Sequence, residues 1–205
     1  MHHSGAIPIP TAIIHNNRFV RDGLMLLLEN EPLFAPVQTY ASCEEAFADP
    51  RFHRVRLVLI GNGLSGLNNP ESIRQLIRYH PNMQVVLCAA REESPDILEA
   101  IRAGAVGFVI QKSAPEKTRK VLRTILQGGS PLNPSLARTI LLQASQPSFR
   151  LRMSAFQQRI LQHAARGDSD RTMASVLNCT TTHIFREIRN IYQQIHRASA
   201  QHKSP

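Results

Sequence analysis

The 205-residue sequence predicts an α/β domain built on a parallel sheet, followed by a smaller all-α domain. Two observations lead to this fold class. From Thr11 to Gly129, short apolar runs alternate with amphipathic stretches, which is typical of a parallel sheet covered by helices on both faces. From Ser154 to Ile195, three helical patterns follow one another. The 42% apolar composition is ordinary for a packed globular chain.

The first part of the chain contains five apolar runs that we predict as strands: 11–14, 37–40, 55–60, 85–88 and 107–110. A helix is expected after each strand. The first should turn Phe19, Leu24, Leu27 and Leu28 to the core, and the second and third should span 44–48 and 71–79. Ser94 should cap the fourth helix, and a Ser113–Glu116 capping box should begin the fifth, which ends at Gly128-Gly129. Five strands and five helices in about 120 residues match a flavodoxin-like (βα)5 domain, whose site lies at the carboxyl ends of the strands.

The second part of the chain has the caps and stripes of three short helices. Ser154 and Gln157 form a capping box for the first helix, which Gly167 ends. Ser169 caps the second, whose buried side is Met173, Val176 and Leu177. Thr180 caps the third, and its inward stripe is expected to be Ile184, Ile188, Ile191 and Ile195. Six residues of that helix should point outward: Thr181, Thr182, Phe185, Arg186, Arg189 and Asn190. Two short helices joined by a tight turn, the second polar and basic outside, suit a DNA major groove.

This segment resembles the helix-turn-helix of the LuxR/NarL family of transcription regulators. The resemblance rests on Gly167, Ser169, Arg171, Met173-Ala174 and the run from Ile184 to Tyr192. It implies double-stranded DNA as the partner and adds Arg171 to the six outward residues as a DNA contact. The family's usual Lys and His fall on Phe185 and Glu187. Family members usually carry a fourth, dimer-forming helix, but the polar residues after Ile195 predict none here.

The first part resembles a response-regulator receiver domain. The similar segments are Ile13-Ile14, Arg21–Leu24, Leu57–Ile60, Ala103–Phe108 and Gly128-Gly129. An ordinary receiver carries a phosphorylatable Asp, an acidic pair for Mg²⁺, a hydroxyl and a lysine. The matching positions here are Gly61 for the Asp, His15 and Asn16 for the acidic pair, Cys88 for the hydroxyl and Gln111 for the lysine.

This degenerate phosphorylation pocket lacks the chemistry for phosphoryl transfer. Mg²⁺ prefers oxygen ligands, mostly carboxylates, which neither Gly61 nor the His15-Asn16 pair supplies. The neutral Gln111 also cannot offset phosphoryl charge as a lysine does. We therefore expect no phosphorylation, no metal and no cofactor. A small-molecule site in this neutral pocket is a weaker hypothesis, and a soft-metal or oxidation site at His15 and Cys88 is weaker still.

The charge is uneven along the chain, whose formal net charge is +9. Residues 147–205 hold nine Lys and Arg against three Asp and Glu, a net charge of +6, and residues 1–146 hold fifteen against twelve, a net charge of +3. Concentrated positive charge favours a polyanionic partner, although a merely solvated basic surface is the alternative.

Three scattered cysteines, Cys43, Cys88 and Cys179, predict buried free thiols. No apolar run is long enough for a membrane span and the start lacks a secretory layout, so we expect a cytoplasmic protein.

We expect a receiver-like domain over 1–128, a helical linker over 129–149, a helix-turn-helix domain over 150–197 and a polar tail over 198–205. The leading hypothesis is a homodimeric transcription regulator that binds DNA without Asp phosphorylation and uses the first domain for dimerisation or for sensing a partner or ligand. The alternative is a protein-interaction regulator that does not bind DNA and sequesters a partner regulator. No enzyme is expected, because the sequence shows no nucleophile–base pair, phosphate loop or metal cluster.

Overall fold

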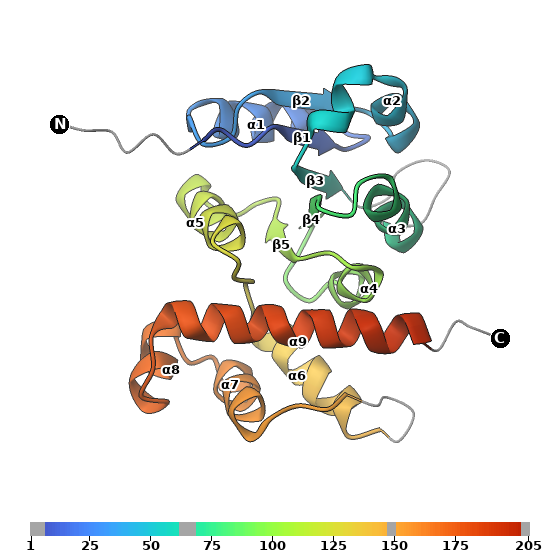
Figure 1. Ribbon diagram of the computed structural model, residues 1–205. Coiled ribbons are helices and arrows are strands. Elements are labelled where there is room, and N and C mark those ends of the chain that lie inside the picture. Colours follow the sequence, from blue (N-terminus) through green and yellow to red (C-terminus); the bar gives the residue numbers. More distant parts are fainter. Residues whose placement is uncertain (1–6, 62–68, 147–150, 202–205) are drawn as a thin grey trace.

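Five parallel strands form one sheet in the order β2-β1-β3-β4-β5. The computed structural model describes residues 7–61, 69–146 and 151–201 (Figure 1). The strands are β1 (Thr11–Ile14), β2 (Val37–Tyr40), β3 (Leu57–Gly61), β4 (Gln84–Ala89) and β5 (Gly107–Ile110). The order reverses between β1 and β3, where Ile14 pairs with Ile60, and Gly61 in turn pairs with Cys88 on β4. This is the flavodoxin-like topology, so the fold-class prediction is confirmed.

Helices cover both faces of the sheet, because side chains alternate along buried strands. On one face Ile13, Leu59 and Val109 pack against α1 (Arg18–Glu29) and α5 (Pro115–Leu126). On the other face Ile14, Ile60 and Leu87 pack against α2 (Cys43–Ala48), α3 (Asn69–Tyr79) and α4 (Asp96–Ala103). A short 3-10 helix, η1 (Pro50–Arg54), precedes β3 and was not predicted.

Three local predictions in this unit are wrong. Phe19 lies on α1 with 85% of its surface exposed, because the buried stripe of that helix runs through Leu24 and Leu28. Ser94 does not cap α4, since the helix begins after Pro95 and the serine hydroxyl lies 3.0 Å from the Asp96 carboxylate instead. Ser113 does not cap α5 either. That helix begins at Pro115, whose missing N–H needs no capping acceptor.

In the described residues four helices follow α5: α6 (Pro134–Ala144), α7 (Ala155–Arg166), α8 (Asp170–Val176) and α9 (Thr181–Gln201). The Ser154–Gln157 capping box is present, and Gly167 ends α7 in the left-handed region at φ 91°. Ser169 caps α8, and the Thr180 hydroxyl accepts from the His183 N–H at 3.2 Å. Met173 and Leu177 are buried as predicted. Val176, the last residue of α8, is 53% exposed, so its predicted burial is wrong.

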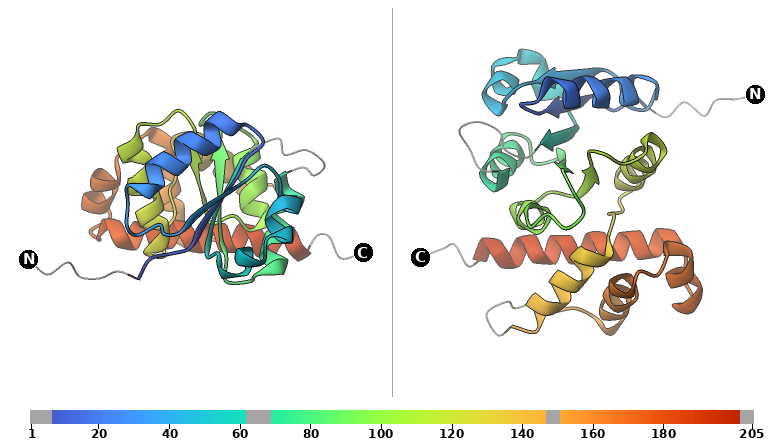
Figure 2. Two further views of the ribbon diagram at one scale, coloured as in Figure 1. Left: turned by 90° about the horizontal axis from the view of Figure 1, so that it is seen from above. Right: turned by 180° about the vertical axis from the view of Figure 1, so that it is seen from behind.

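Helix α9 is longer than predicted. It continues into the expected polar tail as far as Gln201, and its second half lies against α4 (Figures 1 and 2). His196 is fixed there by its Nδ1, which lies 2.9 Å from the Arg102 carbonyl oxygen. Figure 2 shows α9 crossing between the sheet unit and α6–α8. One hydrophobic cluster accordingly joins sheet residues such as Ile60 to α9 residues such as Ile188.

Candidate nucleic-acid interface and strand-end pocket

The strand-end pocket lies at the carboxyl ends of β1, β3, β4 and β5. The structure brings together four of the five residues expected there: His15, Gly61, Cys88 and Gln111. The Gln111 side-chain nitrogen lies 3.1 Å from His15 Nε2 and 3.1 Å from the Cys88 carbonyl oxygen. His15 Nδ1 accepts the Asn17 N–H at 3.0 Å. Asn16 lies at the exposed rim.

The imidazole of His15 fills the space beside Gly61. A Cβ added to Gly61 would lie 2.6 Å from His15 Cγ and 2.7 Å from Nε2, closer than real Cβ atoms come to other heavy atoms. His15 is only 5% exposed. The ring therefore stands where a side chain on Gly61 would have to extend.

None of the four residues brought together in this pocket is a carboxylate, and the His15 ring is favoured in its neutral form. Burial lowers the pKa of His15, and the nearby Arg21 guanidinium lowers it further. Arg21 donates to the backbone carbonyl of His15 and, at 3.1 Å, to that of Asn16. Burial raises the pKa of the Cys88 thiol to about 12, which disfavours the thiolate needed for metal binding or oxidation. Among the described residues, no group of three or more His, Cys, Asp or Glu is placed to hold a metal ion.

Helix α9 has one fully buried stripe and a second, partly buried one. Ile184, Ile188, Ile191 and Ile195 are at most 1% exposed, which confirms the predicted inward stripe. A second stripe faces the sheet unit and its connector, with offsets of four, four, three and four: Thr181, Phe185, Arg189, Tyr192 and His196. The Phe185 carbonyl accepts the Ser130 N–H at 3.1 Å, and the Tyr192 hydroxyl donates to the Pro131 carbonyl.

Arg189 is turned inward within this second stripe. Its Nη1 donates to the Val106 carbonyl at 3.0 Å and reaches the Ser130 hydroxyl at 3.4 Å, and its Nη2 donates to Gln84 Oε1 at 3.2 Å. Burial lowers the pKa of this guanidinium to about 10. The prediction that Arg189 and Phe185 point outward is therefore wrong, because Arg189 donates to Val106 and Gln84 of the receiver and Phe185 packs against Gly129 of the connector.

The outer face of α9 keeps the other predicted residues. Thr182, Arg186 and Asn190 are exposed, as is Arg171 on α8, while Thr181 is half-buried. Glu187 is held by two amides: Gln157 Nε2 donates to it at 2.9 Å, and Asn190 Nδ2 donates to it at 3.1 Å. The sequence analysis did not identify Tyr192 and His196 as residues through which α9 contacts the connector and the receiver. Their helical spacing from Phe185 was the signal that could have identified them.

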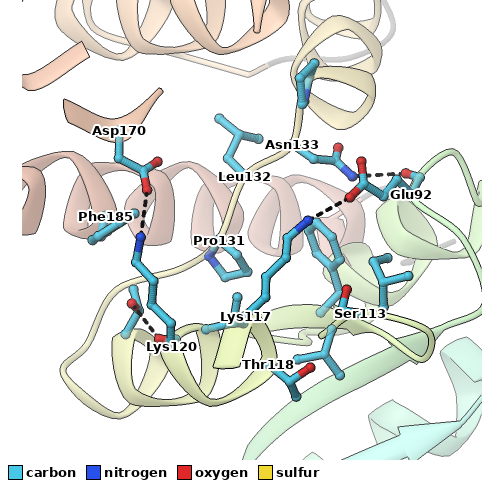
Figure 3. Close-up of a pocket in the computed structure, with 16 residues that line it drawn as sticks. Glu92, Ser113, Lys117, Thr118, Lys120, Pro131, Leu132, Asn133, Asp170 and Phe185 are labelled. Carbon is cyan, nitrogen blue, oxygen red and sulfur yellow. Dashed lines mark hydrogen bonds and ion pairs between the residues drawn. The ribbon is translucent and has the colours of Figure 1, made fainter. Parts of the chain in front are cut away.

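A cavity of about 270 Å³ separates α5 from the connector and from the start of α8 and α9 (Figure 3). Its floor is apolar and includes Phe108, Pro131 and Phe185. Lys117 pairs with Glu92 at 3.0 Å, and Lys120 of α5 reaches Asp170 of α8 at 3.7 Å (Figure 3). These pairs are well exposed, so each adds little stability. They nevertheless join α5 to the loop between β4 and α4 and to α8.

Residues 11–123 match the family described as the response regulator receiver domain, more than half of the chain. The chain belongs to this response regulator family. Response regulator GacA of Pseudomonas protegens is 25% identical over 76% of this chain and 73% of its own length. The nitrate/nitrite response regulator protein NarP of Escherichia coli is 23% identical over 93% of this chain and 90% of its own length. The structure of the two-component response regulator RcsB–DNA complex matches with a TM-score of 0.57 and 16% identity, covering 95% and 96% of the two chains.

These matches place this response regulator with transcription regulators and not with enzymes, in agreement with the sequence. The structural match extends beyond the receiver into the helical region and establishes the fold there. In the described part of the chain, no helix has both the length and the apolar character to cross a membrane.

Proposed function

We propose that this response regulator is a DNA-binding transcription regulator that works without phosphorylation of an aspartate. The observation that carries the proposal is the close packing of the His15 ring against Gly61. Gly61 has no carboxylate to accept a phosphoryl group, and the ring leaves no room for a side chain at that position. The neutral Gln111 at the end of β5 also offers no ammonium for a phosphoryl group. An acyl phosphate needs both an acceptor and nearby positive charge.

DNA binding is supported by the outer face of α9 and the charge of its surroundings. Arg171 and Arg186 are exposed on α8 and α9, as residues on the DNA-contacting face of a helix-turn-helix must be. The net charge of +6 on residues 147–205 favours phosphate contacts. Among the relatives, RcsB has been solved in complex with DNA. A regulator of chromosomal DNA of this kind works in the cytoplasm.

The receiver, in this proposal, controls access to α9. Thr181 and Phe185, near the start of α9, line a shared cavity with Lys120 and Arg123 of α5. A duplex cannot enter on that side unless α9 moves away from the receiver. The regulatory unit covers 1–128 and the connector 129–149, and the DNA-binding unit extends from 150 to the end of α9.

Dimerisation through the receiver is part of the same proposal. Phe19 and Leu26 are 85% and 64% exposed on α1 and lie seven residues apart on one side of that helix. Exposed apolar pairs of this kind favour a protein interface, and a symmetric dimer suits a palindromic site. Phe19→Glu should lower the oligomeric state in sedimentation, with Arg18→Glu as the matched surface control.

The test of function is a gel-shift titration against the chromosomal region upstream of the protein's own gene. We expect micromolar or tighter binding that weakens steeply with salt, because phosphate contacts release counterions. Binding that is absent or insensitive to salt would contradict the proposal.

The second candidate is a regulator that sequesters a related factor without binding DNA. Glu187 favours it, because a carboxylate in the middle of the reading helix repels phosphate. A pull-down from lysate separates the two functions. Recovery of a related regulator, together with no DNA binding in the gel shift, would support this candidate.

A further inference from the structure

Another cavity, of about 320 Å³, lies between the C-terminal half of α9 and the start of β4. The receiver contributes Ile77, Met83 and Gln84 to its lining, and α9 contributes Arg189, Tyr192 and His196. Its volume falls at the lower end of the range, about 300–1,000 Å³, that small-molecule sites occupy. The cavity is separate from the strand-end pocket and from the cavity of Figure 3.

Among the lining residues that the structure describes, Arg189 is the only Lys, Arg, Asp or Glu. Its partners Val106, Ser130 and Gln84 offer neutral oxygens, and no carboxylate of the described residues forms an ion pair with it. Removing a cation from water without a counter-charge is costly, and a bound anion offsets that cost. The positive charge of Arg189 is therefore not neutralised by any described residue of the chain.

The guanidinium also has hydrogen-bonding capacity left. It carries five N–H donors, and the chain offers them three acceptors, two near Nη1 and one near Nη2. Within the described residues, the Nε–H and the second Nη2–H have no acceptor. Nε and Nη2 are neighbours in the planar fork, which a carboxylate matches with two parallel hydrogen bonds.

We infer that this cavity binds a small organic carboxylate, with its charged end on Arg189 and its apolar body against Ile77, Met83 and Tyr192. One carboxylate charge neutralises the single guanidinium. A dianionic phosphate would leave one uncompensated negative charge in a cavity whose lining holds a single guanidinium, which is unfavourable. The assignment to a carboxylate follows from this balance of charge.

The regulatory consequence rests on the proposed function. The cavity exists only while α9 is docked, because α9 and the receiver each supply part of its lining. A carboxylate bound there stabilises the docked arrangement, and by linkage it weakens DNA binding by the factor by which DNA weakens its own binding.

The test is calorimetric titration of the full chain with benzoate, benzamide as its neutral isostere, and inorganic phosphate. We expect benzoate to bind at least tenfold more tightly than either of the others. Arg189→Gln should abolish binding, whereas Arg186→Gln, on the exposed face of α9, should preserve it. If Arg189→Gln does not fold, Gln193→Trp fills the cavity from an exposed position and should also abolish binding.

Failure of benzoate to bind the folded wild-type protein, equal binding of benzamide, tighter binding of phosphate, or wild-type binding by Gln193→Trp would each overturn the carboxylate site. A parallel gel shift with benzoate separates this inference from the proposed function. Benzoate binding without any DNA binding would uphold the site and contradict the proposed function. Benzoate binding with unchanged DNA affinity would uphold the site and contradict the coupling.

Discussion

Gly129 of the connector and Phe185 of α9 lie so close that no side chain fits between them. A Cβ on Gly129 would lie 2.7 Å from Phe185 Cβ and 3.0 Å from Thr124 Cγ2 of α5. The next residue, Ser130, donates its backbone N–H to the Phe185 carbonyl at 3.1 Å. The close packing of α9 against the connector therefore requires a glycine at this position.

Gly129→Ala should loosen this docking. The added methyl group overlaps Phe185, and overpacking of this kind costs about 1–3 kcal/mol of unfolding free energy. We expect a lower melting temperature and, because α9 is released, tighter DNA binding. Gly23→Ala on α1 is the control, since a Cβ there meets nothing within 4 Å and should stabilise the helix by about 0.5–1 kcal/mol. Equal melting temperatures for the wild type and Gly129→Ala would contradict the role of this contact.

Gly61→Asp should not restore phosphorylation. The new carboxylate would collide with the His15 ring, and no acidic pair is present beside it to hold Mg²⁺. We expect no mass increase after incubation with acetyl phosphate and Mg²⁺, together with a lower melting temperature from the collision. A stable acyl phosphate on the wild-type protein would show that the end of β3 has been assigned wrongly.

The sequence predicted the strands and the isoleucine stripe of α9 because both follow from local periodicity. Ile184 and Ile188 recur at helical spacing whatever covers them. The second stripe of α9 could not be predicted in the same way. Phe185 and Arg189 stand among polar residues, and their burial depends on a receiver surface that lies far away in the chain. The filling of the Gly61 site by His15 is likewise a contact between strands and leaves no local pattern.

His15 should make stability depend on pH. Its folded-state pKa is lowered from the ordinary 6.5, mainly by burial, so below about that pH the unfolded chain binds more protons than the folded chain. Its contribution to stability is therefore fully present above pH 6.5 and declines as the pH falls toward the folded-state pKa. Melting temperatures measured between pH 8 and pH 5 should fall less in His15→Phe than in the wild type. His53→Gln, at an exposed position, should retain the wild-type slope.

Arg186 and Arg189, three residues apart on α9, allow DNA binding and the packing of α9 on the receiver to be tested separately. Arg186 is exposed, so Arg186→Ala should weaken DNA binding, reduce the salt dependence by about one phosphate contact and leave the melting temperature unchanged. Arg189 instead donates to Val106 and Gln84, and losing charged hydrogen bonds of this kind costs about 1.5–3 kcal/mol. Arg189→Ala should therefore lower the melting temperature.

Glu187→Ala completes the series on the same helix. Its carboxylate accepts from Gln157 and Asn190, yet it still carries a negative charge toward the proposed DNA face. Removing that charge should strengthen non-specific binding and flatten sequence preference, as measured by gel shift against specific and random duplexes. If Arg186→Ala and Glu187→Ala both left DNA affinity and its salt dependence unchanged, α9 could not be the reading helix. The function would then have to be sought in protein interactions, for which the docked stripe of Phe185 and Tyr192 would be the first surface to test.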